Sequence, residues 1–341
     1  MQRSTIALAC SFLAASGAQA QLVSPTIGTP SLDRWMYPFN GSPGFRLEVS
    51  AFGATLLEGF DDHDAQVLVG FDTSGDIAPG LGEDGYRIIE ATLTMTVSND
   101  LGFTYDDTYD SYTTYVMVGE PDILDTDPGR PINLFLVGYR EGFDQTTFSE
   151  STAFGFVPEV EPAQGMRRAF AAQYDSAGIA MDVSNHLKDQ FEAEPLAIGV
   201  TDTVNPGDLV PADTAFTFSF TPCDQGTGLE LARMLDLGEL RFAVTSMNPA
   251  SGGPDGGSGN YPIFYSKENP IAQIFGYTAT LSLTVRVGDE GDFNGDGEKD
   301  FFDVSGFLTA LSNDDPAADI TGDCQFDFFD VSAFLSAFAA E

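Results

Sequence analysis

Residues 40–287 are dominated by runs in which apolar and polar side chains alternate. An apolar residue at every second position is typical of a strand with one buried face and one solvated face. Glycine, proline, asparagine and aspartate separate the runs, as turns require. The clearest runs place apolar residues at Phe45, Leu47, Val49 and Ala51; at Ala91, Leu93, Met95 and Val97; at Phe216, Phe218 and Phe220; and at Tyr277, Ala279, Leu281, Leu283, Val285 and Val287. Many strands with few helices predict two stacked antiparallel sheets, a β-sandwich.

Helical spacing is sparse in the same region. Residues 228–237 carry it, with Gly238 as a stop, and residues 184–191 are predicted as a second short helix. The glycine-rich stretch 252–260 is predicted to be a surface loop.

The pattern changes after Gly288, and residues 288–341 are called the tail from here on. Two segments of the tail carry apolar residues at helical spacing, Val304, Phe307, Leu308 and Leu311 in one and Val331, Phe334, Leu335 and Phe338 in the other. Residues 292–311 and 319–338 share 12 of 20 positions, which indicates an internal duplication. Two such helices can bury their apolar stripes against each other. So small a unit needs a bound metal for much of its stability.

Each helix follows an acidic loop, and the two loops begin 27 residues apart. Oxygen side chains stand at positions 1, 3, 5, 9 and 12 of a twelve-residue loop, and position 7 supplies a backbone carbonyl. This spacing surrounds one Ca²⁺ with oxygen ligands. The predicted calcium ligands are Asp292, Asn294, Asp296, Glu298, Asp300 and Asp303 in the first loop, and Asp319, Thr321, Asp323, Gln325, Asp327 and Asp330 in the second.

The tail, over residues 291–338, resembles a dockerin of the planctomycete type, in which Asp-Phe-Phe-Asp-Val-Ser recurs. The resemblance implies calcium-dependent attachment to a cohesin-like or surface scaffold protein. Loop positions 10 and 11, which contact the partner in that family, fall on Phe301, Phe302, Phe328 and Phe329. Two departures predict weaker binding at the second loop: Thr321 is a poorer ligand than asparagine or aspartate, and Cys324 replaces a turn glycine.

Residues 21–287 resemble a DNRLRE-type domain, which is related to carbohydrate-binding modules. The resemblance rests on residues 67–74 with 89–95, on 181–184, and on the segment Phe-Tyr-Ser-Lys-Glu at 264–268. It implies a jelly roll. The expected fold is therefore mostly β, an antiparallel jelly-roll β-sandwich over 21–287 with a small α-helical calcium-binding module over 288–341.

The first twenty residues read as a secretory signal peptide, with Arg3, an apolar stretch over 6–15 and Ala18-Gln19-Ala20 as the cleavage site. We therefore expect a secreted, extracellular or cell-surface protein. The apolar stretch is too short to span a membrane. The net charge of −38, from 52 acidic and 14 basic residues, disfavours nucleic acid and anionic membranes as partners.

Without the signal, two cysteines remain, Cys223 and Cys324. Export permits a disulfide between them, and two unpaired thiols are an equal alternative.

Catalytic motifs are missing from the sequence: it has no nucleophile elbow, zinc-protease helix or phosphate loop. His63 and His186 stand far apart and are expected at the surface or in strands. The acidic groups Asp61, Asp62 and Asp64, and Asp106, Asp107 and Asp110, are either further calcium sites or solvated loops. Sugar binding needs exposed aromatic faces, for which the candidates are Trp35, Tyr37, Tyr105, Tyr109, Tyr112, Tyr115 and Tyr261.

The sequence thus predicts a non-catalytic, exported protein that binds carbohydrate or acts in adhesion and is held by a calcium-dependent tail. Two alternatives stay open, a polysaccharide-degrading enzyme of an unrecognised type and a structural envelope component.

Overall fold

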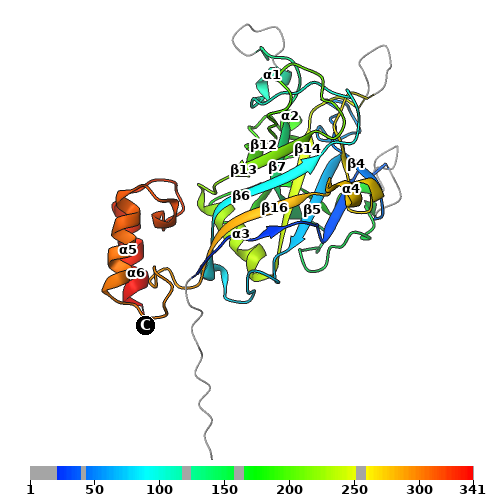
Figure 1. The fold of residues 1–341 in the computed structure, drawn as a ribbon. Helices are drawn as coiled ribbons and strands as arrows, with labels where there is room; N and C mark the ends of the chain where they lie inside the picture. The colour runs from blue at the N-terminus through cyan, green and yellow to red at the C-terminus, as the bar shows by residue number, and fades with distance from the viewer. Residues whose placement is uncertain (1–20, 40–43, 117–123, 157–164, 251–258, 341) are drawn as a thin grey trace, which may run out of the picture.

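The structure is a computed structural model that describes residues 21–39, 44–116, 124–156, 165–250 and 259–340. The predicted signal peptide lies outside these residues, as does most of the loop predicted at 252–260. The fold is mostly β, and its larger sheets are antiparallel (Figure 1).

The smaller of the two main sheets has five strands. Its path runs β1-β16-β6-β13, and β2 pairs with β16. The strands are β1 (Gln21–Val23), β2 (Thr26–Ile27), β6 (Tyr86–Thr96), β13 (Ala215–Phe220) and β16 (Thr280–Val287).

The larger sheet has seven strands in the order β11-β10-β7-β14-β5-β3, with β12 paired to β7. The strands are β3 (Leu32–Met36), β5 (Gln66–Asp72), β7 (Ile132–Tyr139), β10 (Ala169–Tyr174), β11 (Ala180–Asp182), β12 (Ala197–Ile198) and β14 (Glu239–Ser246). Two short pairs stand apart, β4 (Glu48–Ser50) with β15 (Ile263–Tyr265) and β8 (Gly155–Phe156) with β9 (Gly165–Met166).

Short helical elements connect the strands. They are η1 (Glu83–Gly85), α1 (Thr113–Val116), α2 (His186–Asp189), α3 (Gln225–Asp236) and α4 (Pro270–Phe275). Asp224 caps α3 by accepting a hydrogen bond from the amide of Thr227, so this helix begins three residues before the predicted start. The predicted helix at 184–191 is real but shorter, since α2 holds only its middle.

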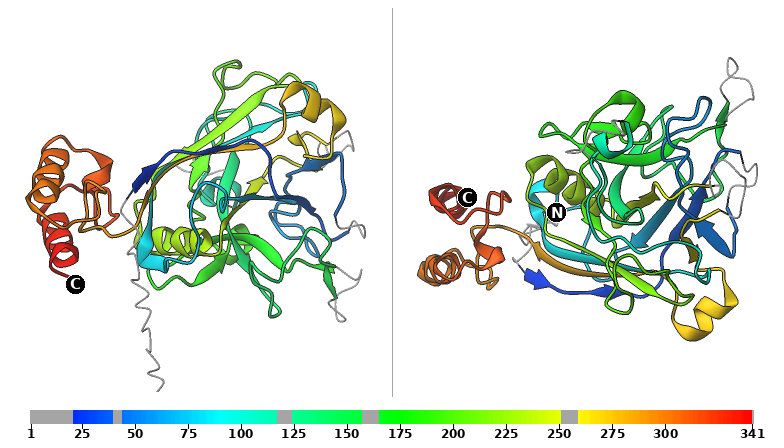
Figure 2. Two further views of the ribbon diagram at one scale, coloured as in Figure 1. Left: turned by 60° about the horizontal axis from the view of Figure 1, so that its bottom comes forward. Right: turned by 90° about the horizontal axis from the view of Figure 1, so that it is seen from above.

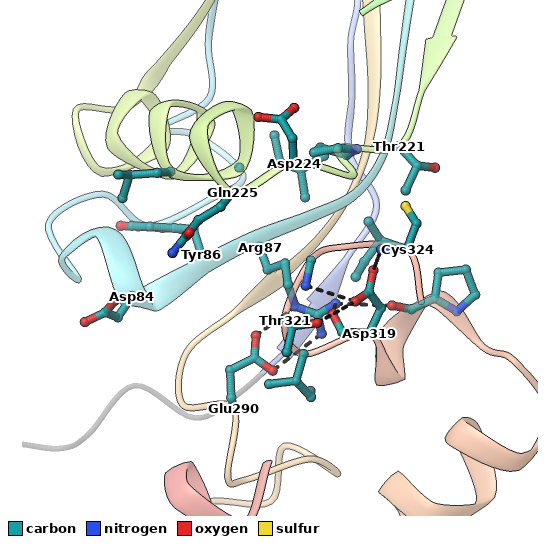
Figure 3. A pocket seen from close by; sticks show the side chains of 18 of the residues that line it. Asp84, Tyr86, Arg87, Thr221, Asp224, Gln225, Glu290, Asp319, Thr321 and Cys324 are labelled. Atoms are coloured by element: carbon teal, nitrogen blue, oxygen red, sulfur yellow. Dashed lines mark hydrogen bonds and ion pairs between the residues drawn. The ribbon is translucent and has the colours of Figure 1, made fainter. Parts of the chain in front are cut away.

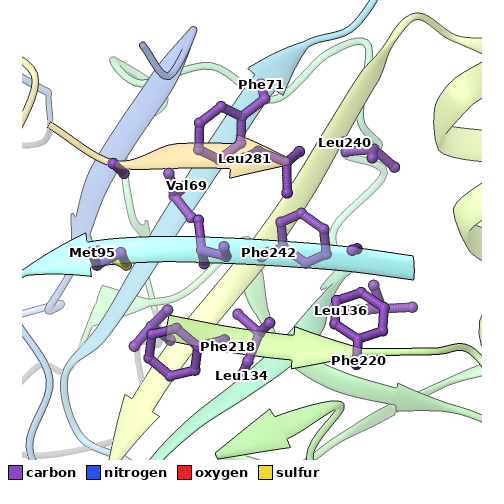
Figure 4. Packing of buried hydrophobic residues seen from close by; sticks show 14 of the residues in the cluster. Val69, Phe71, Met95, Leu134, Leu136, Phe218, Phe220, Leu240, Phe242 and Leu281 are labelled. Atoms are coloured by element: carbon purple, nitrogen blue, oxygen red, sulfur yellow. The ribbon is translucent and has the colours of Figure 1, made fainter. Parts of the chain in front are cut away.

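The main core lies between the two sheets. The alternating residues of β6, β13 and β16 face those of β5, β7 and β14, as Figure 4 shows for Leu281, Phe218 and Phe242. Each fully buried side chain of this size contributes about 1.5–3 kcal/mol. The strand predictions at 91–97 and 216–220 are confirmed, because all their apolar residues are buried. The predicted run at 277–287 is confirmed from Ala279 on, but Tyr277 is only half-buried and lies before β16.

The larger sheet is buried on its second face too. Leu68, Phe135, Val137 and Ala243 point away from the main core and pack under loop residues that include Phe148 and Val183. Burial on both faces explains why β5 and β7 read as continuous apolar runs rather than alternating ones.

The predicted strand at 45–51 is correct only in part. Val49 and Ala51 are buried, but Phe45 and Leu47 are exposed, because β4 is three residues long and pairs only with β15.

The tail forms two helices, α5 (Phe301–Ser312) and α6 (Phe328–Ala339), with η2 (Pro316–Ala318) and the second acidic loop between them. Figure 2 shows the two helices side by side, beyond the end of the sandwich. Phe307 and Phe334 stack face to face with ring centroids 4.2 Å apart and form the centre of a separate small core. Leu308 and Leu335, predicted on the buried stripes, are half exposed because the helices meet along the Phe307–Phe334 line. Among the described residues, no helix has the length and apolar content needed to cross a membrane.

A disulfide between Cys223 and Cys324 joins the sandwich to the second acidic loop. The two cysteines are therefore paired, and the alternative of two unpaired thiols, which the sequence left open, does not apply. The bond closes a loop of 101 residues.

Replacing both cysteines (C223S together with C324S) should lower the free energy of unfolding by about 4–5 kcal/mol, because a cross-link over ~100 residues removes that much entropy from the unfolded chain. Urea denaturation measures the change. Reducing the disulfide of the wild-type protein should give the same midpoint as the double variant. An unchanged midpoint in both would show that the bond does not stabilise the fold.

Candidate functional site

The first acidic loop is organised around Asp292. One of its carboxylate oxygens accepts hydrogen bonds from the amides of Gly295 (2.9 Å) and Asp296 (3.1 Å), and the other accepts from Gly297 (2.9 Å). At the far end of the loop, Asp303 accepts from the amides of Asn294 (2.9 Å) and Asp300 (2.7 Å). Amides of the loop itself therefore donate hydrogen bonds to the carboxylates at both of its ends.

The second loop repeats this geometry. Asp319 accepts from the amides of Gly322 (2.9 Å), Asp323 (3.2 Å) and Cys324 (2.8 Å). Asp330 accepts from the amides of Thr321 (3.1 Å) and Asp327 (2.9 Å). The same bonds at equivalent positions show that the duplication extends to the loop conformation.

Cys324 departs from the first loop at the position that Gly297 holds there. Gly297 has φ of +88° and Cys324 has φ of +58°, both in the left-handed region. A side chain costs energy in that region, while glycine does not. The second loop therefore carries backbone strain that the first loop lacks, at the residue that forms the disulfide.

The predicted ligands divide into two groups by burial. Positions 1 and 12 (Asp292, Asp303, Asp319, Asp330) are buried, and Asp303 and Asp330 are 0% exposed. The other predicted ligands lie at the surface or are half-buried, namely Asn294, Asp296, Glu298, Asp300, Thr321, Asp323, Gln325 and Asp327. Asp300 and Asp327 also cap their helices in capping boxes with Asp303 and Asp330.

The donor set fits a hard divalent cation. Every predicted ligand offers oxygen, and each loop buries two carboxylates, the ligand type that calcium takes in proteins. Carboxylate convergence alone does not single out these loops. Among the described residues, the carboxylate triplets with oxygens within 4.8 Å of one another lie in the sandwich (Asp33, Glu150 and Glu268; Asp106, Asp110 and Asp127).

Two arginines of the sandwich hold the tail. Arg87 of β6 and Arg286 of β16 are directly opposite each other in the sheet, and Glu290 forms ion pairs with both (2.9 and 3.4 Å). Arg286 donates to the backbone carbonyls of Asp292 (3.2 Å) and Phe293 (3.0 Å) in the first loop. Arg286 therefore holds the first loop through its backbone carbonyls.

Arg87 likewise binds backbone carbonyls at the start of the second loop. It donates to the carbonyls of Pro316 (3.2 Å), Ala317 (2.8 Å) and Asp319 (2.6 Å). A cavity of about 430 Å³ lies between this contact and α3, and Figure 3 shows Arg87, Asp319 and Cys324 around it. Neither arginine stands out in the sequence beyond the scarcity of basic residues, because each occupies a polar position of an alternating strand.

The four phenylalanines at loop positions 10 and 11 are exposed in pairs. Phe301 and Phe328 are each 75% exposed, and Phe302 and Phe329 are each 66% exposed. Large apolar side chains with so much accessible surface, repeated by the duplication, are typical of interaction surfaces.

The sugar-binding candidates separate into two sets. Tyr105 and Tyr115 are buried, so their faces are not available, and the hydroxyl of Tyr109 donates to Glu192 (2.6 Å). Tyr112 packs in a small cluster with Tyr115. The other three gather around Phe52, with ring centroids 6.4 Å away for Trp35, 5.2 Å for Tyr37 and 4.7 Å for Tyr261. They are half-buried and form an aromatic cluster at the surface.

The acidic group at 61–64 is a bonded network. Asp61 pairs with Arg167 (2.6 Å), and Asp62 accepts from the amides of Leu56 (3.0 Å) and Lys188 (3.0 Å). Burial raises the pKa of Asp64 to about 7. These contacts leave Asp61 and Asp62 with structural partners.

The two histidines were expected at the surface or in strands, and the expectation of surface positions is wrong. His63 and His186 are both buried and stack with ring centroids 4.9 Å apart. The contacts of Asp62 and Arg167 bring the segments that carry His63 and His186 together. The sequence does not reveal this, because the two histidines are far apart in the chain. Burial lowers the pKa of His63 well below its usual value, with help from His186 and Arg167, and burial also lowers the pKa of His186.

The histidine pair should make the fold sensitive to acid. A histidine held neutral in the fold takes up a proton only on unfolding, so its contribution is present above about pH 6.5 and is lost as the pH falls. Between pH 7 and pH 5, the wild type should lose ~2 kcal/mol more unfolding free energy than His63→Leu. Urea denaturation at both pH values measures this difference, and parallel losses in the two proteins would contradict it.

Comparison with known proteins adds no family. No family model matches this chain, and no curated protein matches it. The functional interpretation therefore rests on the residues and contacts described above.

Proposed function

We propose that this protein is a secreted, non-catalytic adhesion or carbohydrate-binding protein, held at a cell surface or scaffold by a calcium-dependent, dockerin-like tail. The observation that carries the proposal is the paired display of Phe301 with Phe302 and of Phe328 with Phe329. Each pair occupies positions 10 and 11 of a loop with calcium-ligand spacing, and the two pairs are exposed to the same extent. A folding module without a partner gains nothing from such exposure.

Calcium has a structural role in this proposal. The ligands would come from Asp292, Asn294, Asp296, Asp300 and Asp303 in the first loop and from their equivalents in the second, with the carbonyls of Glu298 and Gln325. The ion would coordinate the buried carboxylates at the two ends of each loop. It thereby holds the start of each helix, and the adjacent phenylalanine pair, in place.

The jelly-roll sandwich would supply the second binding function. The cluster of Trp35, Tyr37 and Tyr261 around Phe52 offers aromatic faces of the kind on which sugar rings stack. A glycan array on the intact protein tests this part. Reducing-sugar release from a bound polysaccharide would favour the enzymatic alternative, and self-assembly without glycan binding would favour an envelope component.

Variants at loop position 12 should distinguish calcium binding at the first loop from calcium binding at the second. In calorimetric titration of the full chain, Asp303→Asn should remove the tighter tail site and Asp330→Asn the weaker one, because Thr321 and the strained Cys324 weaken the second loop. Each variant should bind one ion fewer than the wild type. A wild-type stoichiometry in both would overturn the calcium assignment.

The phenylalanine pairs should carry attachment and not calcium binding. Replacing Phe301 and Phe302 by alanine, together with Phe328 and Phe329, should abolish calcium-dependent retention of the full chain on envelopes of the producing cells. Calcium titration should be unchanged. Phe275→Ala is the matched control, since Phe275 is 65% exposed but lies on α4 of the sandwich. Equal retention of the quadruple variant and the control would refute the role of the pairs.

A further inference from the structure

Among the described residues, two groups of three carboxylates converge in the sandwich, and one already holds a cation of the chain itself. Asp33, Glu150 and Glu268 surround Lys267, whose ammonium nitrogen lies 3.3 Å from Asp33 and 2.6 Å from Glu268 and also contacts Glu150. The lysine satisfies this group. It also shows what such a cluster needs, a positive charge at its centre.

The second group is formed by Asp106, Asp110 and Asp127. One carboxylate oxygen from each lies within 4.8 Å of the others. Calcium binds oxygens at about 2.3–2.6 Å, so oxygens on opposite sides of one ion are separated by about twice that distance. All three can therefore belong to one coordination sphere.

The segment that carries Asp106 and the segment that carries Asp127 lie in close contact at this group. Gly129 has φ of +114°, and a Cβ at that position would stand 2.9 Å from the Cβ of Asp106. Only glycine allows this approach, which brings Asp127 to Asp106. Thr108 links them, since its hydroxyl lies 2.8 Å from Asp106 and 2.9 Å from Asp127.

One carboxylate oxygen of Asp106 has no hydrogen-bond partner among the residues that the structure describes. One of its carboxylate oxygens accepts from the amide and hydroxyl of Thr108. The other oxygen is buried and has no hydrogen-bond partner among the described residues, although the residue is only 4% exposed. A buried, unpaired carboxylate oxygen is costly, and a bound ion is one of its few explanations.

The charge around the group is also unbalanced. Arg130 forms ion pairs with Asp110 (3.1 Å) and Asp125. The hydroxyl of Tyr115 donates to Asp110 (3.0 Å). Four carboxylates thus share one guanidinium, and the two that Arg130 contacts do not include Asp106 or Asp127.

We infer that Asp106, Asp110 and Asp127 bind a hard divalent cation, Ca²⁺, at a site independent of the tail. All the available donors are oxygens, which favours calcium over metals that take histidine or cysteine. The site follows the end of β6, whereas the tail contacts Arg87 at its start, and Figure 1 shows α1 of this region well away from the tail. Asp127 also lines a cavity of about 650 Å³ with Asn248 and Asn260. The ion would therefore stand beside an open cleft.

Tyrosine-sensitised terbium luminescence of the full chain, with competition by Ca²⁺, tests this site. Tyr109, Tyr112 and Tyr115 belong to the same segment as the ligands, while the tail contains no tyrosine or tryptophan. Tyr86 lines the cavity beside the second tail loop, so the titration is made in the Asp303→Asn, Asp330→Asn background. Asp106→Asn is compared there with Asp107→Asn, which removes the same charge from an exposed neighbour.

Asp107→Asn should keep the luminescence and its displacement by Ca²⁺, and Asp106→Asn should lose at least tenfold in terbium affinity. Asp127→Asn should lose affinity as well, which keeps the test valid if Asp106→Asn does not fold. Melting in chelator checks folding, and there Asp106→Asn should be at least as stable as the background protein, because it removes a buried charge. Equal terbium affinity in folded Asp106→Asn, Asp127→Asn and Asp107→Asn would overturn the site.

Discussion

The burial of negative charge in the tail is the constraint on which this interpretation depends. Asp292, Asp303, Asp319 and Asp330 lie inside a module whose own core is little more than Phe307, Phe334 and Ala318 with half-buried neighbours. Carboxylates are the residue type that such a small core can least accommodate without a positive partner. Backbone amides donate hydrogen bonds to all four carboxylates, and Arg286 adds positive charge near Asp292 and Asp303. In the proposed function, a divalent cation in each loop would add positive charge beside these carboxylates, consistent with the ligand spacing of the loops.

Contacts with the sandwich hold the tail in a fixed position. Arg87 and Arg286 would repel each other as direct neighbours in the sheet, and Glu290 offsets this by pairing with both. The arginines hold the backbone of the two loops, and the Cys223–Cys324 disulfide fastens the second loop covalently. The phenylalanine pairs are consequently presented at a set position relative to the sandwich. That arrangement suits a protein that binds one partner through each end.

Sequence reasoning succeeded where a local pattern controls the outcome. The strands around Leu93, Phe218 and Leu283 alternate because one face meets the core, and the tail helices follow their capping aspartates Asp300 and Asp327. It failed where burial depends on distant segments. Phe45 is exposed because the chain there pairs with a single short strand, and the β5 run is continuous because loops cover its second face.

The sites show the same division. The candidate loops of the tail could be proposed from spacing alone, because all the predicted ligands of each loop lie within twelve residues. The stacking of His63 on His186, the arginine contacts and the approach of Asp127 to Asp106 join residues far apart in the chain or set by one glycine. Of these, only the acidic run at 106–110 was visible as a candidate beforehand, and its partner Asp127 was not.

Hydrogen exchange of the amides of Gly295, Asp296 and Gly297, which all bond to Asp292, tests the central claim most directly. In the full chain with Ca²⁺ these amides should be protected, and in chelator they should exchange rapidly while amides of β6 and β14 stay protected. Equal protection of the loop amides with and without the ion would contradict the claim that calcium holds the tail in its folded form.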